Sequence, residues 1–465
     1  MRKITRGNDD TIAAIATPMG ETGIGVVRMS GSESLVIADK VFRTKGSTPP
    51  SRAESFRVLY GHLVDPATGE VVDEALLLVL KPPRTYTREE MVEVFAHGGS
   101  LVLQRILDLL LKQGARLAEP GEFTKRAFLN GRIDLSQAEA VLDVIRSKTD
   151  ASLRAALNQL EGKLSKEIRS MRDELLESLV QVEAAIDFPD EDIEILSDAK
   201  LSGRLQKVCE TLEALLAGAS QGRVLREGLT TVIAGRPNVG KSSLLNALLR
   251  HNRAIVTPIA GTTRDAIEEL ANIRGIPVRL VDTAGIQETT DAIEQEGIRR
   301  SRSYLEKADL VLLVVDGSVP PTEEDKRLYK ELSGKPLLCV VNKADLPQAL
   351  EPSSLFRTNG VKPVSVSATN GTGLGLLEEA IVGSVYQGKA CLSENALLTQ
   401  SRHKESVRHS CEAVRRATTL LSQRASGEFI ASELREALQA LGEIVGEVFT
   451  EDLLDRIFSQ FCIGK

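Results

Sequence analysis

The sequence predicts a multidomain protein of the class α/β plus α. A discontinuous helical domain in it carries an inserted α/β domain. The chain has 465 residues, and roughly 150 residues per domain divides it into about three domains. Twice along the chain, apolar residues recur every three or four positions over a long stretch, which is typical of helices. Between those stretches, short β-type runs alternate with helix-length segments, which indicates a mainly parallel sheet with helices on both faces.

The first region, residues 1–125, is expected to be a mixed α/β domain. Apolar runs such as 75–80 and 91–95 indicate strands, and residues 100–114 indicate a helix. Gly23-x-Gly25-x-x-Arg28 matches the start of a dinucleotide-binding fingerprint, but an arginine replaces the third glycine. We therefore interpret these glycines as turn residues.

The helical domain is expected in two parts, residues 126–227 and 388–465, which flank the inserted domain at 228–387. In the first part, apolar residues from 153 to 186 form one stripe along a single long helix. A second helix is expected at about 201–216. The stripe fits packing within the chain or against a partner, and packing within the chain is the simpler interpretation. Insertion of a compact domain into an exposed loop explains the order.

Composition excludes several classes of protein. The net charge of −7 is unlike the overall basic footprint of a nucleic-acid-binding protein, although a local basic patch stays open. The five cysteines form no CxxC pair, so neither a disulfide framework nor a zinc site is indicated, and a reducing cytoplasm fits. No apolar stretch reaches the length of a membrane span. No secretory signal is expected at the N-terminus.

A phosphate-binding loop is predicted at residues 235–242, which read Gly-Arg-Pro-Asn-Val-Gly-Lys-Ser and match GxxxxGK[ST]. The segment follows an apolar run and precedes a helix-length segment, so phosphates would meet backbone N–H groups at a helix N-terminus. Lys241 would reach the β- and γ-phosphates, and the Ser242 hydroxyl would bind Mg²⁺. The pattern alone is loose, so the interpretation depends on the motifs that follow it.

Three further motifs come in the order found in G proteins, each after an apolar run. Residues 282–285 (Asp-Thr-Ala-Gly) would bring a carboxylate near Mg²⁺ and a backbone N–H near the γ-phosphate. Residues 342–345 (Asn-Lys-Ala-Asp) supply a carboxylate for the paired donors of guanine, which adenine lacks. Residues 367–369 (Ser-Ala-Thr) would support the base. Four such loops at the carboxyl ends of parallel strands predict a domain that binds and hydrolyses GTP.

A first switch is predicted at residues 257–265, a segment rich in Gly and Thr that would close over the γ-phosphate. Thr263 is the expected second Mg²⁺ ligand beside Ser242. Ile286 follows the second motif, where Ras-type enzymes have a water-orienting Gln. An aliphatic side chain cannot orient water, so hydrolysis needs another polar group and another positive charge. The residues expected to contact GTP are Asn238, Val239, Gly240, Lys241, Ser242, Ser243, Thr257, Pro258, Ile259, Ala260, Gly261, Thr262, Thr263, Asp282, Thr283, Ala284, Gly285, Asn342, Lys343, Asp345, Ser367, Ala368 and Thr369.

Five segments together resemble the MnmE family, also called TrmE, of tRNA-modification GTPases, whose G domain is of the TrmE-Era-EngA type. They are residues 121–131, 235–243, 261–265, 282–285 and the terminal Cys-Ile-Gly-Lys at 462–465. The resemblance spans the whole chain in order and includes both flanking regions. It implies an N-terminal α/β domain that binds folate and dimerises, a helical domain in two parts, and an inserted P-loop GTPase domain.

The resemblance also implies activation by potassium. In this family a P-loop Asn and backbone carbonyls of the first switch hold K⁺ where an arginine finger would otherwise act, and the cation stabilises charge on the transferring phosphoryl group. The matching positions are Asn238, Thr257, Ile259 and Thr262. Glu294 matches the glutamate that orients the attacking water, so Glu294 and Lys241 are the expected catalytic residues. Without the resemblance, Glu294 reads as a solvated charge.

For the N-terminal domain, the resemblance implies a 5-formyl-tetrahydrofolate-type one-carbon donor. The matching positions are Arg28, Glu93, Arg132 and Lys465. Arg132 stands where relatives carry Lys, so only the charge is retained, and each of these side chains could equally be a surface charge. Cys462 in the terminal motif suggests a role in tRNA modification, although a free Cys is usually a small buried hydrophobe.

The resemblance further implies a homodimer that forms a heterotetramer with an FAD-containing MnmG/GidA-type partner and modifies the wobble uridine of certain tRNAs with an aminomethyl-type group. GTP hydrolysis would drive closure and opening of the two G domains, in the cytoplasm and without a membrane. The alternative is a regulatory switch such as a ribosome-assembly GTPase, which needs no folate pocket. A scaffold that only binds GTP is a third interpretation, and the intact Lys241, Ser242 and Asp282 argue against it.

Overall fold

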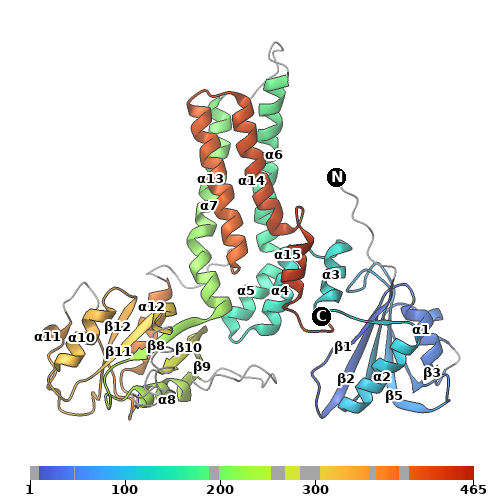
Figure 1. Ribbon diagram of the computed structural model, residues 1–465, viewed down its shortest axis with the longest axis horizontal. Helices are drawn as coiled ribbons and strands as arrows, with labels where there is room; N and C mark the ends of the chain where they lie inside the picture. The colour runs from blue at the N-terminus through green and yellow to red at the C-terminus, as the bar shows by residue number, and fades with distance from the viewer. Residues whose placement is uncertain are drawn as a thin grey trace, which may run out of the picture. The chain divides into compact units, whose positions relative to one another are not determined.

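The computed structural model describes residues 10–46, 48–187, 198–252, 268–282, 304–356, 363–386 and 397–465. Its contacts divide the chain into two compact units, Met1–Leu142 with Gly442–Lys465 and Asp143–Leu441. Each unit has its own sheet, and the second also contains a bundle of long helices (Figure 1). Among the residues with described placement, no helix is both long and apolar enough to cross a membrane.

The first unit is built on a seven-stranded sheet in the order β3-β4-β5-β6-β2-β1-β7. Neighbouring strands are antiparallel except β1 and β7, which are parallel. Buried apolar side chains of the sheet pack against α1 and α2 on one face. The elements are β1 (Ile12–Ile15), β2 (Thr22–Ser30), α1 (Ser34–Val41), β3 (Phe42–Thr44), the 3-10 helix η1 (Pro50–Arg52), β4 (Arg57–Val64), β5 (Val71–Leu80), β6 (Met91–Gly98), α2 (Ser100–Lys112) and β7 (Arg116–Leu117).

The expectation that Gly23 and Gly25 are turn residues is wrong, because both lie inside β2. A Cβ atom on Gly25 would lie 2.5 Å from Cδ2 of Leu103 in α2. A side chain here would push against Leu103, and the register of β2 with β6 shifts between Thr22 and Gly25.

The C-terminal segment completes the first unit. Helices α3 (Glu122–Leu129) and α15 (Glu451–Phe458) share an apolar cluster with the start of α4 (Leu135–Arg146). Phe128 contacts Phe449 edge to face, with ring centroids 5.4 Å apart. This packing brings the last residues of the chain back to β1 and β2, where Gly464 lies against the backbone of Ile15.

The second unit contains the long helices α5 (Asp150–Leu160), α6 (Lys163–Asp187), α7 (Asp198–Glu227), α13 (Ser401–Ser422) and most of α14 (Gly427–Val445). Figure 1 shows α6, α7, α13 and α14 side by side. Ion pairs join Arg416 of α13 to Glu433 of α14 and Arg435 of α14 to Glu183 of α6.

The prediction of one long helix from residue 153 to 186 is wrong, because the helix is interrupted between α5 and α6. Gly162 there has a φ of 82°, the left-handed conformation that ends helices. The apolar stripe of α6 is buried within the unit, whereas Leu153 and Leu157 of α5 are exposed. Helix α7 also extends beyond the expected 201–216, to Glu227 just before the first strand of the second sheet.

The second sheet has the order β13-β12-β11-β8-β10-β9 and is parallel except for the β9–β10 pair, as the sequence predicted. One buried cluster lies against α8 and α12, and another contains residues at α10 and α11, so both faces of the sheet carry a core. The elements are β8 (Leu229–Ala234), α8 (Lys241–Asn252), β9 (Glu268–Ile273), β10 (Ile276–Asp282), β11 (Leu310–Asp316), α10 (Glu323–Leu332), β12 (Leu337–Asn342), α11 (Pro352–Leu355), β13 (Val364–Ser365) and α12 (Leu374–Tyr386). The parallel strands end at one edge, and the predicted nucleotide motifs follow them there.

Candidate functional site

The loop between β8 and α8 has the backbone shape of a phosphate cradle. Gly240 has a φ of 93°, and a Cβ atom on it would lie 2.3 Å from Nδ2 of Asn342, so only glycine fits. Lys241 begins α8, and its ammonium group donates to the carbonyls of Gly235 at 2.7 Å and Arg236 at 2.9 Å. The charge is therefore held over the loop at the N-terminus of a helix, where anions are favoured.

Ser242, one of the two expected Mg²⁺ ligands, lies next to this loop, whereas Thr263 lies outside the described residues. Ser242 Oγ donates to Asp282 Oδ2 at 2.8 Å, which joins α8 to the end of β10. A hydroxyl and a carboxylate are hard oxygen donors, the ligands that Mg²⁺ prefers, so these two residues fit the ion. Burial lowers the pKa of Lys241, while the negative charges of Asp282 and Glu324 act in the opposite direction.

The guanine motif is tied to the other loops by side-chain hydrogen bonds. Asn342 ends β12, donates from Nδ2 to the carbonyl of Val239 at 2.9 Å, and accepts from the N–H of Ala368 at 3.1 Å. It thereby connects the phosphate loop to the loop after β13. Ser367 Oγ donates to Asp345 Oδ1 at 2.5 Å and orients that carboxylate. The predicted base-binding residues are thus brought together by contacts among themselves.

Sequence reasoning missed Asp316. It ends β11, and in the sequence it lies between the predicted motifs at 282–285 and 342–345. Its Oδ2 accepts a hydrogen bond from Lys343 Nζ at 2.6 Å, and its Oδ1 accepts from Ser318. Burial would raise the pKa of Asp316, but the bonds from Lys343 and Ser318 outweigh burial and leave the pKa below its usual value. Lys343 has a φ of 65°, a strained conformation for a residue other than glycine, and the ion pair helps to hold it. The available signal was an aspartate at the end of an apolar run, as at Asp282.

Several predicted residues lie outside the described part of the chain, and their roles stay predictions. They are Thr257, Pro258, Ile259, Ala260, Gly261, Thr262, Thr263, Thr283, Ala284, Gly285 and Glu294. Among the described residues, Asn238 is in the phosphate loop with a φ of 64°. Ser243 lies in the first turn of α8, and Thr369 is exposed after Ala368.

A second cluster of predicted site residues forms in the first unit. Arg28 on β2 donates from Nε to Glu93 Oε1 on β6 at 2.7 Å, and from Nη1 to the carbonyl of Gly464 at 3.1 Å. Arg28 and Glu93 are partners in the sheet register, which explains their meeting. Burial and the nearby charge of Arg28 lower the pKa of Lys465, against the pull of Glu93. Three of the four residues predicted to bind folate therefore lie together.

Two aromatic rings that sequence reasoning missed join this cluster. The guanidinium carbon of Arg28 lies 5.8 Å from the ring centroid of Tyr86 and 5.6 Å from that of Phe123. Arg132, the fourth predicted residue, lies 4.6 Å from the Tyr86 centroid. Cations at these distances from a ring face are attracted by it. Phe123 falls within residues 121–131, the segment that carries part of the family resemblance, so a signal for it was available.

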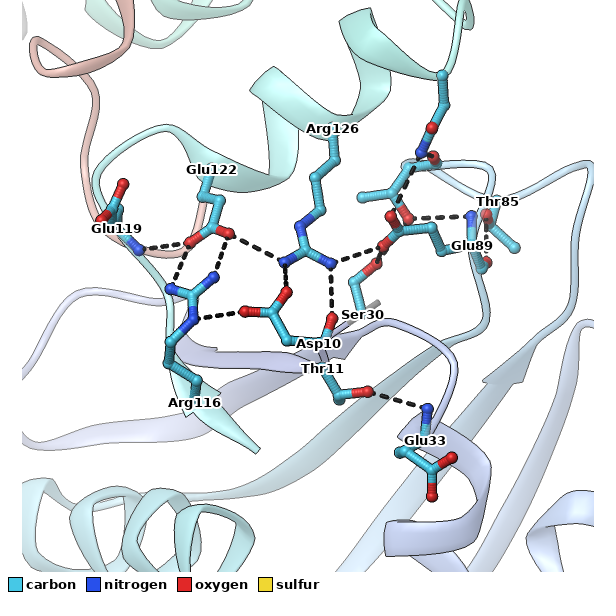
Figure 2. A network of polar contacts seen from close by, with 12 residues as sticks. Asp10, Thr11, Ser30, Glu33, Thr85, Glu89, Arg116, Glu119, Glu122 and Arg126 are labelled. Atoms are coloured by element: carbon cyan, nitrogen blue, oxygen red, sulfur yellow. Dashed lines mark hydrogen bonds and ion pairs between the residues drawn. The ribbon is translucent and has the colours of Figure 1, made fainter. Parts of the chain in front are cut away.

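An ion network holds α3 against the sheet of the first unit (Figure 2). Arg126 pairs with Asp10 at 2.7 Å, Glu122 at 3.0 Å and Glu89 at 3.2 Å. Arg116 pairs with Asp10 and Glu122, each at 2.7 Å. Burial raises the pKa of Glu122, but hydrogen bonds from Arg116 and Arg126 outweigh it and leave the pKa below its usual value. The network fixes the helix that contributes an aromatic ring to the cluster.

Cys462 is exposed, whereas Cys209, Cys339 and Cys411 are buried. Its backbone carbonyl accepts hydrogen bonds from the N–H groups of Gly121 at 3.5 Å and Lys465 at 3.3 Å. The terminal segment is therefore anchored through its backbone while the residue remains accessible. Cys462 is therefore not a small buried apolar residue, as free cysteines usually are.

Comparison with known proteins covers nearly the whole chain. Residues 11–132 match the family model for the GTP-binding protein TrmE N-terminus, and residues 135–462 match the MnmE helical domain. The tRNA modification GTPase MnmE of Geobacillus thermodenitrificans is 48% identical over 98% of this chain and 99% of its own length. MnmE of Alkaliphilus metalliredigens is 47% identical with the same coverage. Among solved structures, the G domain of the T. maritima FeoB iron transporter is 30% identical, covers 34% of this chain and 98% of its own, and has a TM-score of 0.26.

Proposed function

Since the chain belongs to the MnmE family of tRNA-modification GTPases, we propose that it is a potassium-activated GTPase that modifies the wobble uridine of certain tRNAs. It does so in the cytoplasm as a homodimer, in a heterotetramer with an FAD-containing MnmG/GidA-type partner. The added aminomethyl-type group draws on a tetrahydrofolate one-carbon donor. The observation that carries the proposal is the 48% identity over 98% of the chain, which includes both regions outside the G domain.

For hydrolysis, each residue has a role that follows from its chemistry. Lys241 contacts the β- and γ-phosphates and stabilises the charge that develops on the transferring phosphoryl group. Ser242 and Thr263 hold Mg²⁺, which neutralises phosphate charge when bound. Glu294 orients the attacking water, because Ile286 has no polar atom for that purpose. The four potassium-site residues named above, Asn238 among them, supply the oxygen atoms that hold K⁺.

The potassium mechanism is tested by GTP hydrolysis rates in potassium chloride and sodium chloride at equal ionic strength. We expect a large stimulation by potassium in the full-length protein and its loss in Asn238→Ala. Glu294→Ala should slow hydrolysis in potassium while nucleotide affinity is retained. Equal rates in the two salts would leave GTP hydrolysis in place and rule out the role given to Asn238.

In the first unit, the folate donor is held by the cluster of Arg28, Glu93, Arg132 and Lys465. The cationic side chains attract the carboxylates of a folate's glutamate tail, and the Glu93 carboxylate accepts from the N–H groups of the pterin. The aromatic ring of Tyr86, already beside two guanidinium groups, offers a flat apolar surface. Nitrogen donors, a carboxylate acceptor and an aromatic face are thus present, which fits this class of ligand.

The modification itself is tested by reconstitution with the FAD-containing partner, tRNA, GTP, potassium and 5-formyl-tetrahydrofolate. We expect a new modified nucleoside at the wobble position, detected by mass spectrometry of digested tRNA. Cys462→Ser in the same assay separates a chemical role of the thiol from a role of the anchored backbone. If calorimetry detects no folate binding and no nucleoside forms, the regulatory switch becomes the better interpretation.

A further inference from the structure

Apart from both sites, two buried cysteines on different helices face each other beside a glutamate. Cys209 and Glu213 lie one helical turn apart on α7, and Cys411 lies on α13. The two Sγ atoms are 3.8 Å apart, and Cys209 Sγ lies 3.3 Å from Glu213 Oε1. All three potential ligand atoms lie within 4.8 Å of one another, the single such group found in the part of the chain that the structure describes.

The sulfur–sulfur and Cys209–Glu213 distances match a tetrahedral metal centre. At a Zn–S bond of about 2.3 Å, two thiolates on one tetrahedral ion lie about 3.8 Å apart, and a carboxylate oxygen lies about 3.5 Å from either sulfur. We propose that Cys209, Glu213 and Cys411 bind a thiophilic divalent metal ion such as Zn²⁺. The three protein ligands leave one position for water, which reaches the site because Glu213 is exposed at the helix surface.

The charges at this position balance when the ion is bound. Both thiols lose a proton, so the ion with charge +2 meets two thiolates and one carboxylate. Arg415 Nη2 lies 2.7 Å from Glu213 Oε1 and supplies the remaining positive charge.

A bound ion would join the two helices that flank the inserted domain in the sequence. Helix α7 leads into β8, and α13 is the first helix described after that domain. Figure 1 shows α7 and α13 lying against each other along much of their length. The ligands are separated by 202 residues, so the ion closes a long loop and stabilises the folded state over the unfolded chain.

Disulfide formation is the competing chemistry for this pair. It requires the two sulfurs to approach from 3.8 Å to about 2.05 Å and a disulfide or peroxide oxidant to accept two electrons and two protons. Metal binding requires no such approach. Glu213, which hydrogen-bonds to Cys209, adds a third ligand atom for a metal ion. The geometry therefore favours the metal.

Cobalt(II) titration of the reduced, chelator-treated full-length protein tests the proposal. We expect a thiolate-to-cobalt charge-transfer band that saturates at one equivalent and disappears when Zn²⁺ is added. Cobalt at the Mg²⁺ site has oxygen ligands and contributes no sulfur band. Cys209→Ser and Cys411→Ser should each abolish or shift the band, whereas Cys339→Ser and Cys462→Ser, the matched controls, should retain it.

Glu213→Gln provides a variant whose fold is not at risk, since the side chain is at the surface. It should keep a two-sulfur band and bind Zn²⁺ about tenfold more weakly, or weaker still. The proposal is overturned if wild type shows no sulfur band, or if the band survives in Cys209→Ser/Cys411→Ser. Recovery of a Cys209–Cys411 disulfide and no bound metal would also overturn it. None of these readouts depends on GTP hydrolysis, so the result is independent of the proposed function.

Discussion

The nucleotide site of the second unit and the Arg28 cluster of the first unit are assembled in different ways. Around the nucleotide site, each predicted loop follows a parallel strand, and the loops contact one another through backbone groups and short side chains such as Asn342 and Ser367. In the Arg28 cluster, residues from β2, β6, α3 and the C-terminus meet through long charged and aromatic side chains.

This difference explains how far each site can be recognised. A loop that binds phosphate with its backbone needs particular residues in succession, so the requirement is written in a short motif. A cluster of side chains needs only that strand register and helix packing bring them together. Its members are far apart in the sequence and any one of them looks like an ordinary surface charge. We expect substitutions at the two sites to have separate effects, on GTP hydrolysis and selectivity at one site and on folate affinity at the other.

The largest effect is expected for Lys241→Ala. The variant removes the charge held over the phosphate loop, and kcat for GTP should fall by about 10²–10³, which corresponds to roughly 3–4 kcal/mol of transition-state stabilisation. Steady-state phosphate release measures this. Folate binding in calorimetry should not change, because the two sites share no residue. A fall of less than fivefold would contradict the role of Lys241.

Glu122→Gln tests the ion network beneath α3. It leaves the buried guanidinium of Arg126 with less opposing charge, so the first unit should lose about 3 kcal/mol of its free energy of unfolding. Because the pKa of Glu122 is depressed in the folded state, its contribution is complete above about pH 4.5 and is lost as pH falls through the lower folded pKa. Urea unfolding between pH 3 and 7 should therefore show a shallower acid decline in the variant. Asp455→Asn, at an exposed pair with Lys125, is the control and should change stability by at most about 0.5 kcal/mol.

Asp345→Asn should weaken the preference for GTP over ATP by about tenfold to hundredfold. The carboxylate that accepts from two guanine donors is lost, and a hydrogen bond to a charged group is worth about 1.5–3 kcal/mol. Competition of each nucleotide against a fluorescent GDP analogue gives the ratio. Unchanged selectivity would remove Asp345 from base recognition.

Arg28→Gln should reduce affinity for 5-formyl-tetrahydrofolate by about tenfold, because one charged partner is lost and Glu93 is left without its ion pair. Isothermal titration calorimetry measures the loss. Arg105→Gln, at an exposed ion pair with Glu70, is the matched control and should bind folate as wild type does. The GTP hydrolysis rate should be the same in both variants. Equal folate affinity in the two would show that the Arg28 cluster is structural only.

The sequence alone predicted the mainly parallel sheet of the second unit and the phosphate and guanine motifs that follow its strands. The motifs at Lys241, Asp282, Asn342 and Ser367 depend on contiguous residues, and alternating apolar runs predicted the parallel strands that place them at one edge. The family followed from two of these motifs together with residues 121–131, 261–265 and 462–465. The boundaries at residues 125, 227 and 387 stay predictions. Helix α3 runs across residue 125, and residue 387 lies outside the described part of the chain.

Tertiary structure decided what depends on residues that are distant in the sequence. Register brought Arg28 to Glu93, helix packing added Phe123, and the ion pair with Lys343 revealed Asp316. Only the fold shows that Gly25, predicted as a turn residue, lies in β2 beside Leu103 of α2. Periodicity reports which face of a helix is apolar but not where a helix breaks or which helix lies opposite. For that reason the break at Gly162 and the meeting of Cys209 with Cys411 appear only once the chain is folded.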